Sequence, residues 1–198
     1  MQDLGQIKED LRAILARRVQ ERIKVNGADY DQASVLLPLF IRDGQYWLLF
    51  TKRTNTVEYH KGEVSFPGGV VDEVDDSLEG TARRETFEEI GVREEDIEIL
   101  GQLDDIPTMT SRFIIHPFVG VVPFPYVFKI NRREVEHLIE VPLRFFFDPS
   151  QPQPFSINNK GDVFETPAFI YEGAVIWGAT QRILENFIKL IRPKILLS

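Results

Sequence analysis

Apolar residues recur along the chain with two spacings, one typical of helices and one typical of strands. Over residues 3–22 they lie three or four positions apart, which predicts an amphipathic helix. Residues 33–41 and 46–52 are apolar or β-prone runs, and the four residues between them, 42–45, include a glycine that favours a hairpin turn. A glycine-rich loop at 62–69 follows this predicted hairpin.

Helical spacing returns at residues 77–90, and Gly91 is the kind of residue that ends a helix. Residues 97–103 and 113–122 are expected to form strands. Residues 131–140 are predicted to form a short helix, because the apolar residues of this segment would share one face.

The last part of the chain combines a proline-rich stretch with a final helix. Residues 148–155 contain three prolines and 158–161 carry a turn signal, so this region is predicted to be a long loop or a loose hairpin. A closing helix is expected at 178–191, ended by Pro193. Strands and helices in this order predict an α+β or α/β protein with layers around a mixed sheet.

Length and composition indicate one folded domain. The chain has 198 residues, of which 43% are hydrophobic and 27% charged. It contains no cysteine, which excludes a disulfide scaffold, a thiolate zinc site and a cysteine nucleophile. The amino terminus does not resemble a secretory signal, and the longest apolar stretch, 35–41, is too short to span a bilayer. We therefore expect a soluble, cytoplasmic protein.

The charge of the chain is concentrated in one segment. A net charge of −8, from 31 acidic and 23 basic residues, argues against broad adhesion to nucleic acids or anionic membranes. Residues 72–98 alone hold 12 acids and 3 bases, so the remainder is close to neutral. This segment includes the predicted helix at 77–90, which is therefore the first candidate for chemistry.

Three carboxylates of this helix are predicted to share one partly buried strip. With about 100° per residue, the side chains that would face the core are Leu78, Ala82, Thr86 and Ile90. Glu85, Glu88 and Glu89 then lie within roughly 100° at the edge of that stripe. A hard divalent cation would relieve their repulsion, and Mg²⁺ fits best because carboxylates and substrate phosphates are its usual ligands. The alternative is a solvated acidic face.

Two glycines before the helix offer a second part of such a site. Gly68 and Gly69 permit close backbone approach, so a carbonyl could complete a metal shell or an amide could meet a phosphate; the alternative is an ordinary turn. Loop and helix together read GGVVDEVDDSLEGTARRETFEEIGV from Gly68 to Val92. This segment resembles the Nudix box, G-x5-E-x7-R-E-U-x-E-E-x-G-U, where U is a bulky apolar residue.

The second half of the segment matches the box and the first half departs from it. Arg84-Glu85, Glu88-Glu89 and Gly91-Val92 agree in register, with Thr86 at a position that is usually apolar. The upstream acid falls on Asp75 instead of a glutamate, and one extra residue precedes Arg84.

The resemblance implies a Nudix fold, an α/β/α sandwich of the α+β class with a mixed sheet between helices. A single domain is expected over 1–198, with a helical extension at 1–30 and the Nudix core at 33–190.

The resemblance also implies a reaction and roles for residues. Members of the family mostly hydrolyse a nucleoside diphosphate linked to another group, with Mg²⁺ or Mn²⁺ spreading charge as water attacks the pyrophosphate. Arg84 would orient Glu85. The implied metal ligands are Glu85, Glu88, Glu89 and the carbonyl of Gly68 or Gly69. Glu88 would alternatively act as a base through water, and the general base can come from elsewhere, with Glu134 as candidate and Glu136 and Glu140 as alternatives.

A stretch before the box is similar to a motif of the coenzyme A pyrophosphatases. Residues 48–69, LLFTKRTNTVEYHKGEVSFPGG, follow the pattern L-L-T-x-R-[SA]-x3-R-x3-G-x3-F-P-G-G, with Glu58 where the pattern has arginine. The one-residue-longer box and the stretches 131–135, 141–143 and 176–180 also resemble this subfamily.

The first hypothesis is therefore hydrolysis of coenzyme A or acyl-coenzyme A to adenosine 3′,5′-bisphosphate and the phosphopantetheine portion. Lys52, Arg53 and Lys61 are candidate phosphate ligands together with Gly68, and their alternative role is to solubilise a strand edge. Because Glu58 reverses a charge, the affinity for coenzyme A is expected to fall if that arginine normally meets a phosphate.

Other functions are open alternatives. A related hydrolase would act on ADP-ribose, a dinucleotide or a nucleotide sugar, and a silent Nudix domain would sense a nucleotide without turnover. Isopentenyl diphosphate isomerases share the fold, but the scheme that they resemble employs a catalytic cysteine, which this chain lacks. The helix at 3–22 and the loop at 148–167 offer a surface that two copies could share, so a homodimer is a further expectation.

Overall fold

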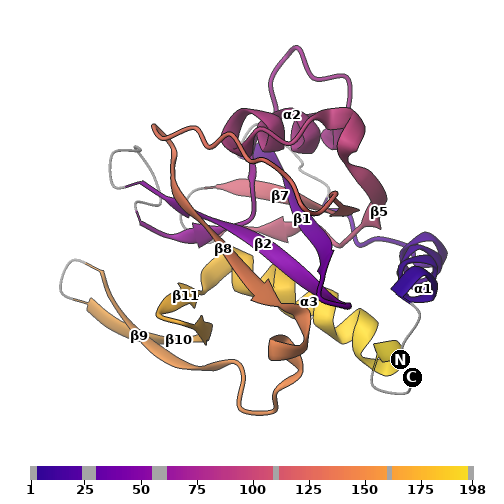
Figure 1. Cartoon of the computed structure of the whole chain (residues 1–198). Coiled ribbons are helices and arrows are strands. Elements are labelled where there is room, and N and C mark those ends of the chain that lie inside the picture. Colours follow the sequence, from indigo (N-terminus) through magenta and orange to yellow (C-terminus); the bar gives the residue numbers. More distant parts are fainter. Residues whose placement is uncertain (1–3, 24–29, 55–61, 109–111, 160–161, 196–198) are drawn as a thin grey trace.

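A mixed β-sheet with helices on both faces forms the body of the protein (Figure 1). The computed structural model describes residues 4–23, 30–54, 62–108, 112–159 and 162–195. Glu58 and Lys61, which the sequence singles out, lie outside the described residues. No helix in the described ranges has the length and apolar character needed to cross a membrane.

The elements follow one another in a fixed order. The first half contains α1 (Leu4–Arg17), β1 (Asp31–Arg42), β2 (Gln45–Arg53), β3 (Val64–Ser65), β4 (Gly68–Val70), α2 (Leu78–Ile90), η1 (Glu94–Asp96), β5 (Glu98–Gln102) and β6 (Ile106–Pro107). The second half contains β7 (Phe113–Val121), β8 (Val135–Pro142), η2 (Leu143–Phe147), β9 (Gln153–Asn159), β10 (Asp162–Tyr171), β11 (Ala174–Ile176) and α3 (Gly178–Ile195).

The main sheet has the strand order β3-β2-β1-β7-β5, with β4 paired to β1, β6 to β7 and β8 to β2. Strands β1 and β7 are parallel, from the pair Asp31 and Phe113 to the pair Leu39 and Val121, and the other pairs of this sheet are antiparallel. The long apolar run of β1 suits this central position, because a strand covered on both faces needs apolar residues in succession.

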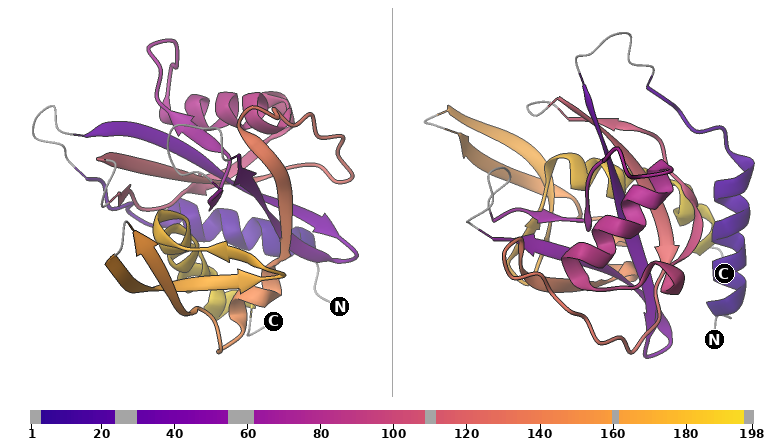
Figure 2. Two further views of the ribbon diagram at one scale, coloured as in Figure 1. Left: turned by 90° about the vertical axis from the view of Figure 1, so that its left-hand side faces the viewer. Right: turned by 90° about the horizontal axis from the view of Figure 1, so that it is seen from above.

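Helix α2 covers one face of the sheet and helices α1 and α3 cover the other (Figure 2). The core under α2 includes Leu36, Phe40 and Ile90, whereas the core under α1 and α3 includes Leu15 and Phe187. The predicted α+β fold, an α/β/α sandwich around a mixed sheet, is confirmed.

The predicted hairpin turn and the predicted helix end at Gly91 are confirmed, and the structure adds an N-cap at Ser77. Asp43 and Gly44 have φ values of 51° and 71°, which is the geometry of a two-residue hairpin turn between β1 and β2. Ser77 caps α2, since its hydroxyl accepts a hydrogen bond from the Gly80 amide at 3.0 Å. Gly91 ends the helix in the left-handed conformation, with φ at 73°.

Three predictions about elements are wrong or need adjustment. The segment 131–140 is no helix: β8 begins at Val135 and pairs with β2, because the open edge of β2 offers a ladder that outweighs local propensity. Helix α1 ends at Arg17, and the following main chain is held instead by Asp104 and Asp105. Helix α3 runs to Ile195, so the proline expected to end it lies in the last turn.

A second, three-stranded sheet has the order β11-β10-β9. Strands β9 and β10 form an antiparallel hairpin that extends to one side of the body, so the region expected to be a loop or loose hairpin is a hairpin (Figure 1). Its inner end joins the main core through buried Phe169 and Ile176.

Helix α1 is predicted to be part of the stabilising core. Leu15 is 1% exposed, and a Cβ at Gly101 of β5 would lie 2.6 Å from its Cβ, so helix and strand are in close contact. We expect Leu15→Ala to lower the free energy of unfolding by about 2–5 kcal/mol in urea denaturation, because the substitution leaves a cavity. Val19→Ala, at a side chain 92% exposed, is the control and should change it by less than about 0.5 kcal/mol. Equal effects would show that α1 is dispensable.

Candidate active site

The inward face of α2 carries a deeply buried carboxylate. Glu89 is 2% exposed and lies beside Arg53 of β2, with 3.5 Å between a Glu89 carboxylate oxygen and the guanidinium. The other carboxylate oxygen, Oε2, accepts no hydrogen bond from any described residue. Burial raises the pKa of Glu89 to about 8, although Arg53 and the main chain of Gly68 act in the opposite direction. A buried, incompletely partnered carboxylate would be stabilised by binding a cation or a proton.

Glu85 lies one helical turn earlier, against the backbone of β4. A Cβ at Gly69 would be 2.4 Å from the carboxyl carbon of Glu85, so only glycine leaves room for this approach. Burial raises the pKa of Glu85 as well, and the negative charges of Glu88 and Glu134 act in the same direction. Gly69 and Glu85 are therefore brought together as the sequence expects.

Arg84 holds Glu85 from the side and is itself fixed. Its guanidinium donates to Glu85 Oε1 at 2.7 Å and forms a fork on Asp75, with distances of 2.7 and 2.9 Å to the two carboxylate oxygens. Hydrogen bonding from Arg84 keeps the pKa of Asp75 far below its ordinary value. Asp75, the residue at which the chain departs from the Nudix box, thus anchors the arginine.

Glu88 differs from the two inward glutamates. Its side chain is 52% exposed, and its only contact with the cluster is a 3.4 Å approach to Arg84 among the described residues. The structure therefore places Glu88 at the solvent edge, where it can meet a bound group but does not enclose one.

Glu134, Glu136 and Glu140 are the candidate general bases outside the box, and the structure distinguishes Glu134 from the other two. The negative charge of Glu134 raises the pKa of both Glu85 and Glu89, so its carboxylate lies within electrostatic reach of them. Glu140 forms an ion pair with Arg42, and Glu136 is exposed beside His137.

Of the two candidate phosphate ligands on β2, Arg53 faces Glu89. Lys52 precedes it at a point where the register between β2 and β8 is irregular, and it is half-buried. Gly68 pairs with Val35 of β1, and a Cβ there would lie 2.3 Å from the carbonyl oxygen of Ser34. The glycine is required by this close packing of β4 on β1.

The carboxylate oxygens of Glu85 and Glu89 fit a hard divalent cation that also binds phosphate oxygens of the substrate. In the described part of the chain, no three acidic or histidine side chains form a ready metal cage. Mg²⁺ commonly takes one or two carboxylates and completes its shell with water and phosphate oxygens. Glu85 and Glu89, with an oxygen of Glu89 unpartnered, supply that many ligands.

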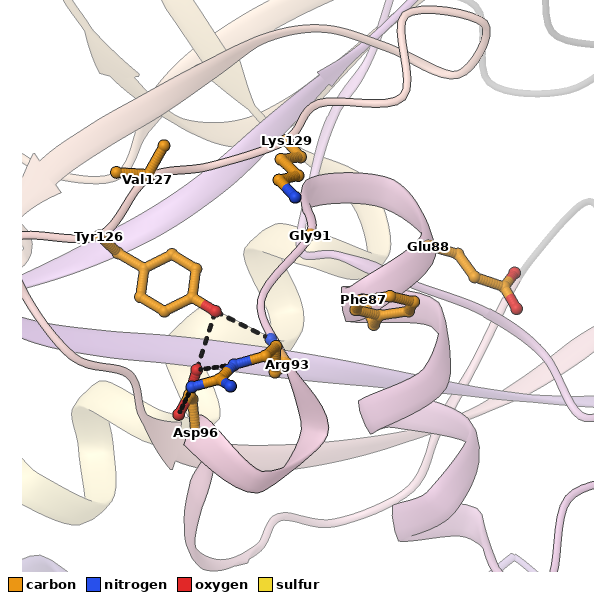
Figure 3. Close-up of a pocket in the computed structure, with 8 residues that line it drawn as sticks. All are labelled: Phe87, Glu88, Gly91, Arg93, Asp96, Tyr126, Val127 and Lys129. Carbon is orange, nitrogen blue, oxygen red and sulfur yellow. Dashed lines mark hydrogen bonds and ion pairs between the residues drawn. The ribbon is translucent and has the colours of Figure 1, made fainter.

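A pocket of about 590 Å³ lies beyond the cluster, at the carboxyl end of α2 (Figure 3). It is lined by Phe87, Glu88, Gly91, Arg93, Asp96, Tyr126, Val127 and Lys129. Arg93, Asp96 and Tyr126 satisfy one another by hydrogen bonds of 2.9–3.0 Å. Glu88 is the lining residue that also contacts Arg84. The buried carboxylates, and not this pocket, are therefore taken as the candidate site.

Comparisons with known proteins identify the family of this chain. The NUDIX domain model matches residues 31–160. The "Uncharacterized Nudix hydrolase NudL" of Enterobacter sp. (strain 638) is 36% identical over 155 residues, covering 78% of this chain and 80% of that protein. The protein of the same name from Citrobacter koseri is 34% identical over 167 residues, covering 83% and 86%.

A solved structure shows the same fold. The MutT/nudix family protein from Enterococcus faecalis aligns with a TM-score of 0.56 over 97% of this chain and 76% of that chain, at 14% identity. The chain therefore belongs to the Nudix hydrolase family and is a pyrophosphohydrolase, a class of enzyme that generally uses divalent metal cations.

Proposed function

We propose that the chain hydrolyses the pyrophosphate bond of coenzyme A or acyl-coenzyme A, with Mg²⁺ or Mn²⁺, to adenosine 3′,5′-bisphosphate and (acyl-)4′-phosphopantetheine. The observation that carries the proposal is the unpartnered oxygen of buried Glu89 beside Glu85 and Arg53. The resemblance of residues 48–69 to the coenzyme A pyrophosphatase motif supports this substrate, because Arg53 of that motif meets the carboxylate cluster.

Each residue of the cluster has a task in this reaction. Glu85 and Glu89 would hold the cation, which when bound neutralises charge on the pyrophosphate oxygens. Arg84 keeps Glu85 in place, and Gly69 leaves room for the Glu85 carboxylate. Arg53 presents a guanidinium to the same space, where it suits a phosphate oxygen.

Glu134 is proposed as the general base. It would take a proton from the attacking water, and the support for this role is that its charge acts on both Glu85 and Glu89. Glu88, at the solvent edge, would contact the substrate or a water molecule. A cytoplasmic location and a homodimer remain predictions from the sequence.

Incubation with a panel of substrates tests the proposal. With Mg²⁺ or Mn²⁺ we expect coenzyme A to yield adenosine 3′,5′-bisphosphate, identified by mass spectrometry. Glu89→Gln should lower kcat by about 10³-fold or more, because loss of a metal ligand removes several kcal/mol of transition-state stabilisation. Glu136→Gln, on the exposed part of β8, is the matched control. Fast cleavage of ADP-ribose alone would exclude coenzyme A, and an unchanged Glu89→Gln variant would contradict the metal role.

The stability of the metal-free protein should fall as pH rises. The folded-state pKa of Glu89 is about 8 against an ordinary value of 4.5, so the folded protein binds more protons between these values. Raising the pH from 4.5 through 8 therefore removes stability that Glu89→Gln would keep. In urea denaturation with EDTA, we expect this variant to gain roughly 1–3 kcal/mol relative to wild type between pH 5 and pH 9. Parallel pH curves would refute the raised pKa.

Gly69→Ala should reduce activity by displacing Glu85. The new Cβ would overlap the Glu85 carboxylate, and a misplaced ligand should cost about 10²-fold in kcat. Gly80→Ala is the matched control on α2, because its Cβ meets mainly the movable carboxylate of Asp76. Comparable kcat values for both variants and wild type would show that the approach of Glu85 to Gly69 is unimportant.

A further inference from the structure

The segment before β8 crosses the carboxyl end of α2 and is fixed to it. The last carbonyls of a helix have no partner within the helix. Here the Lys129 amide donates to the Ile90 carbonyl at 2.9 Å, and the Asn131 amide donates to the Glu89 carbonyl at 2.9 Å. Gly91 permits this contact, since a Cβ there would lie 2.7 Å from Lys129 Cβ. Residues 129–131 are therefore held at a set distance from the Glu89 backbone.

Asn131 is the point at which this segment meets the base. Its carbonyl accepts from the amides of Glu134 at 3.0 Å and Val135 at 2.9 Å. Its side-chain oxygen accepts from the Arg133 amide at 3.2 Å, which stabilises the turn. Its side-chain nitrogen donates to Glu134 Oε1 at 2.9 Å. One residue thus joins the backbone of Glu89 to the carboxylate of Glu134.

The hydrogen bond from Asn131 to Glu134 opposes an electrostatic repulsion between carboxylates. Glu134 is close enough to Glu85 and Glu89 for its charge to destabilise theirs, so the like charges tend to turn the Glu134 side chain towards solvent. A donor on Oε1 holds the carboxylate in place, and the second oxygen, Oε2, would accept the proton of a water molecule.

We propose that Asn131 is a positioning residue for hydrolysis, acting through Glu134. The inference rests on the proposed function, because it needs Glu134 to be the base. It goes further in assigning a task to a residue that lies outside the Nudix box.

Two substitutions of Asn131 separate positioning from folding. Asn131→Asp keeps the oxygen that accepts from the Arg133 amide but replaces the donor facing Glu134 with a negative charge, whereas Asn131→Ala removes both. With the best substrate of the panel, we expect both variants to lower kcat by about 10–10²-fold and to change KM by less than about twofold, since a misplaced base impairs only proton transfer. Lys129→Ala, in the same segment without a bond to Glu134, is the control and should keep its kcat.

The Glu134→Ala background supplies the decisive comparison. If Asn131 acts through Glu134, adding Asn131→Asp to Glu134→Ala should change kcat by less than about twofold. An equal loss in both backgrounds, or full activity of Asn131→Asp beside an impaired Asn131→Ala, would overturn the inference in favour of a structural role. Full activity of Glu134→Ala would also overturn it while leaving the function proposed for Glu89 intact, and a wild-type chain that cleaves no substrate would overturn both.

Discussion

The structure around α2 depends on one unfavourable interaction, the burial of the Glu89 carboxylate. A carboxylate at 2% exposure with one oxygen unpartnered loses hydration that the protein replaces only in part. Arg53 compensates from β2, at 3.5 Å, and the close packing of β4 on β1 brings the Gly68 main chain to the other side. Segments that are distant in the sequence converge on this group, which is where we propose that a cation and a diphosphate bind.

The local part of this arrangement could be predicted from the sequence. Helical spacing puts Glu85, Glu88 and Glu89 at the edge of the apolar stripe. In the structure Glu89 is buried within that face, Glu85 is mostly buried and Glu88 lies on the solvent side. Gly91 ends α2 as predicted, because a helix end is determined by the conformation of the residue that follows it. Such features involve residues within one or two turns, so periodicity and capping chemistry suffice to find them.

The non-local part could not be predicted in this way. The segment 131–140 has helical periodicity, yet pairing with β2, some 85 residues earlier, makes it a strand and brings Glu134 to the cluster. Spacing alone leaves Glu134, Glu136 and Glu140 equivalent, whereas the register of β8 with β2 and the ion pair of Glu140 with Arg42 distinguish them. For the same reason α1 is shorter than its periodicity suggests, because contacts with Asp104 and Asp105 fix the chain that follows it.

Asp75 and Glu89 carry side-chain carboxylates that are both largely shielded from solvent, but their hydrogen-bond partners differ. The Asp75 side chain is 4% exposed, but it accepts a fork from Arg84 and a hydrogen bond from the Thr81 hydroxyl, and its pKa is lowered. Glu89 is 2% exposed and has a raised pKa and an oxygen that accepts no hydrogen bond from a described residue. The same fold thus provides partners for both oxygens of Asp75 but not for both oxygens of Glu89. Asp75 therefore serves the structure, and this difference is why we propose Glu89 as a ligand of the cation.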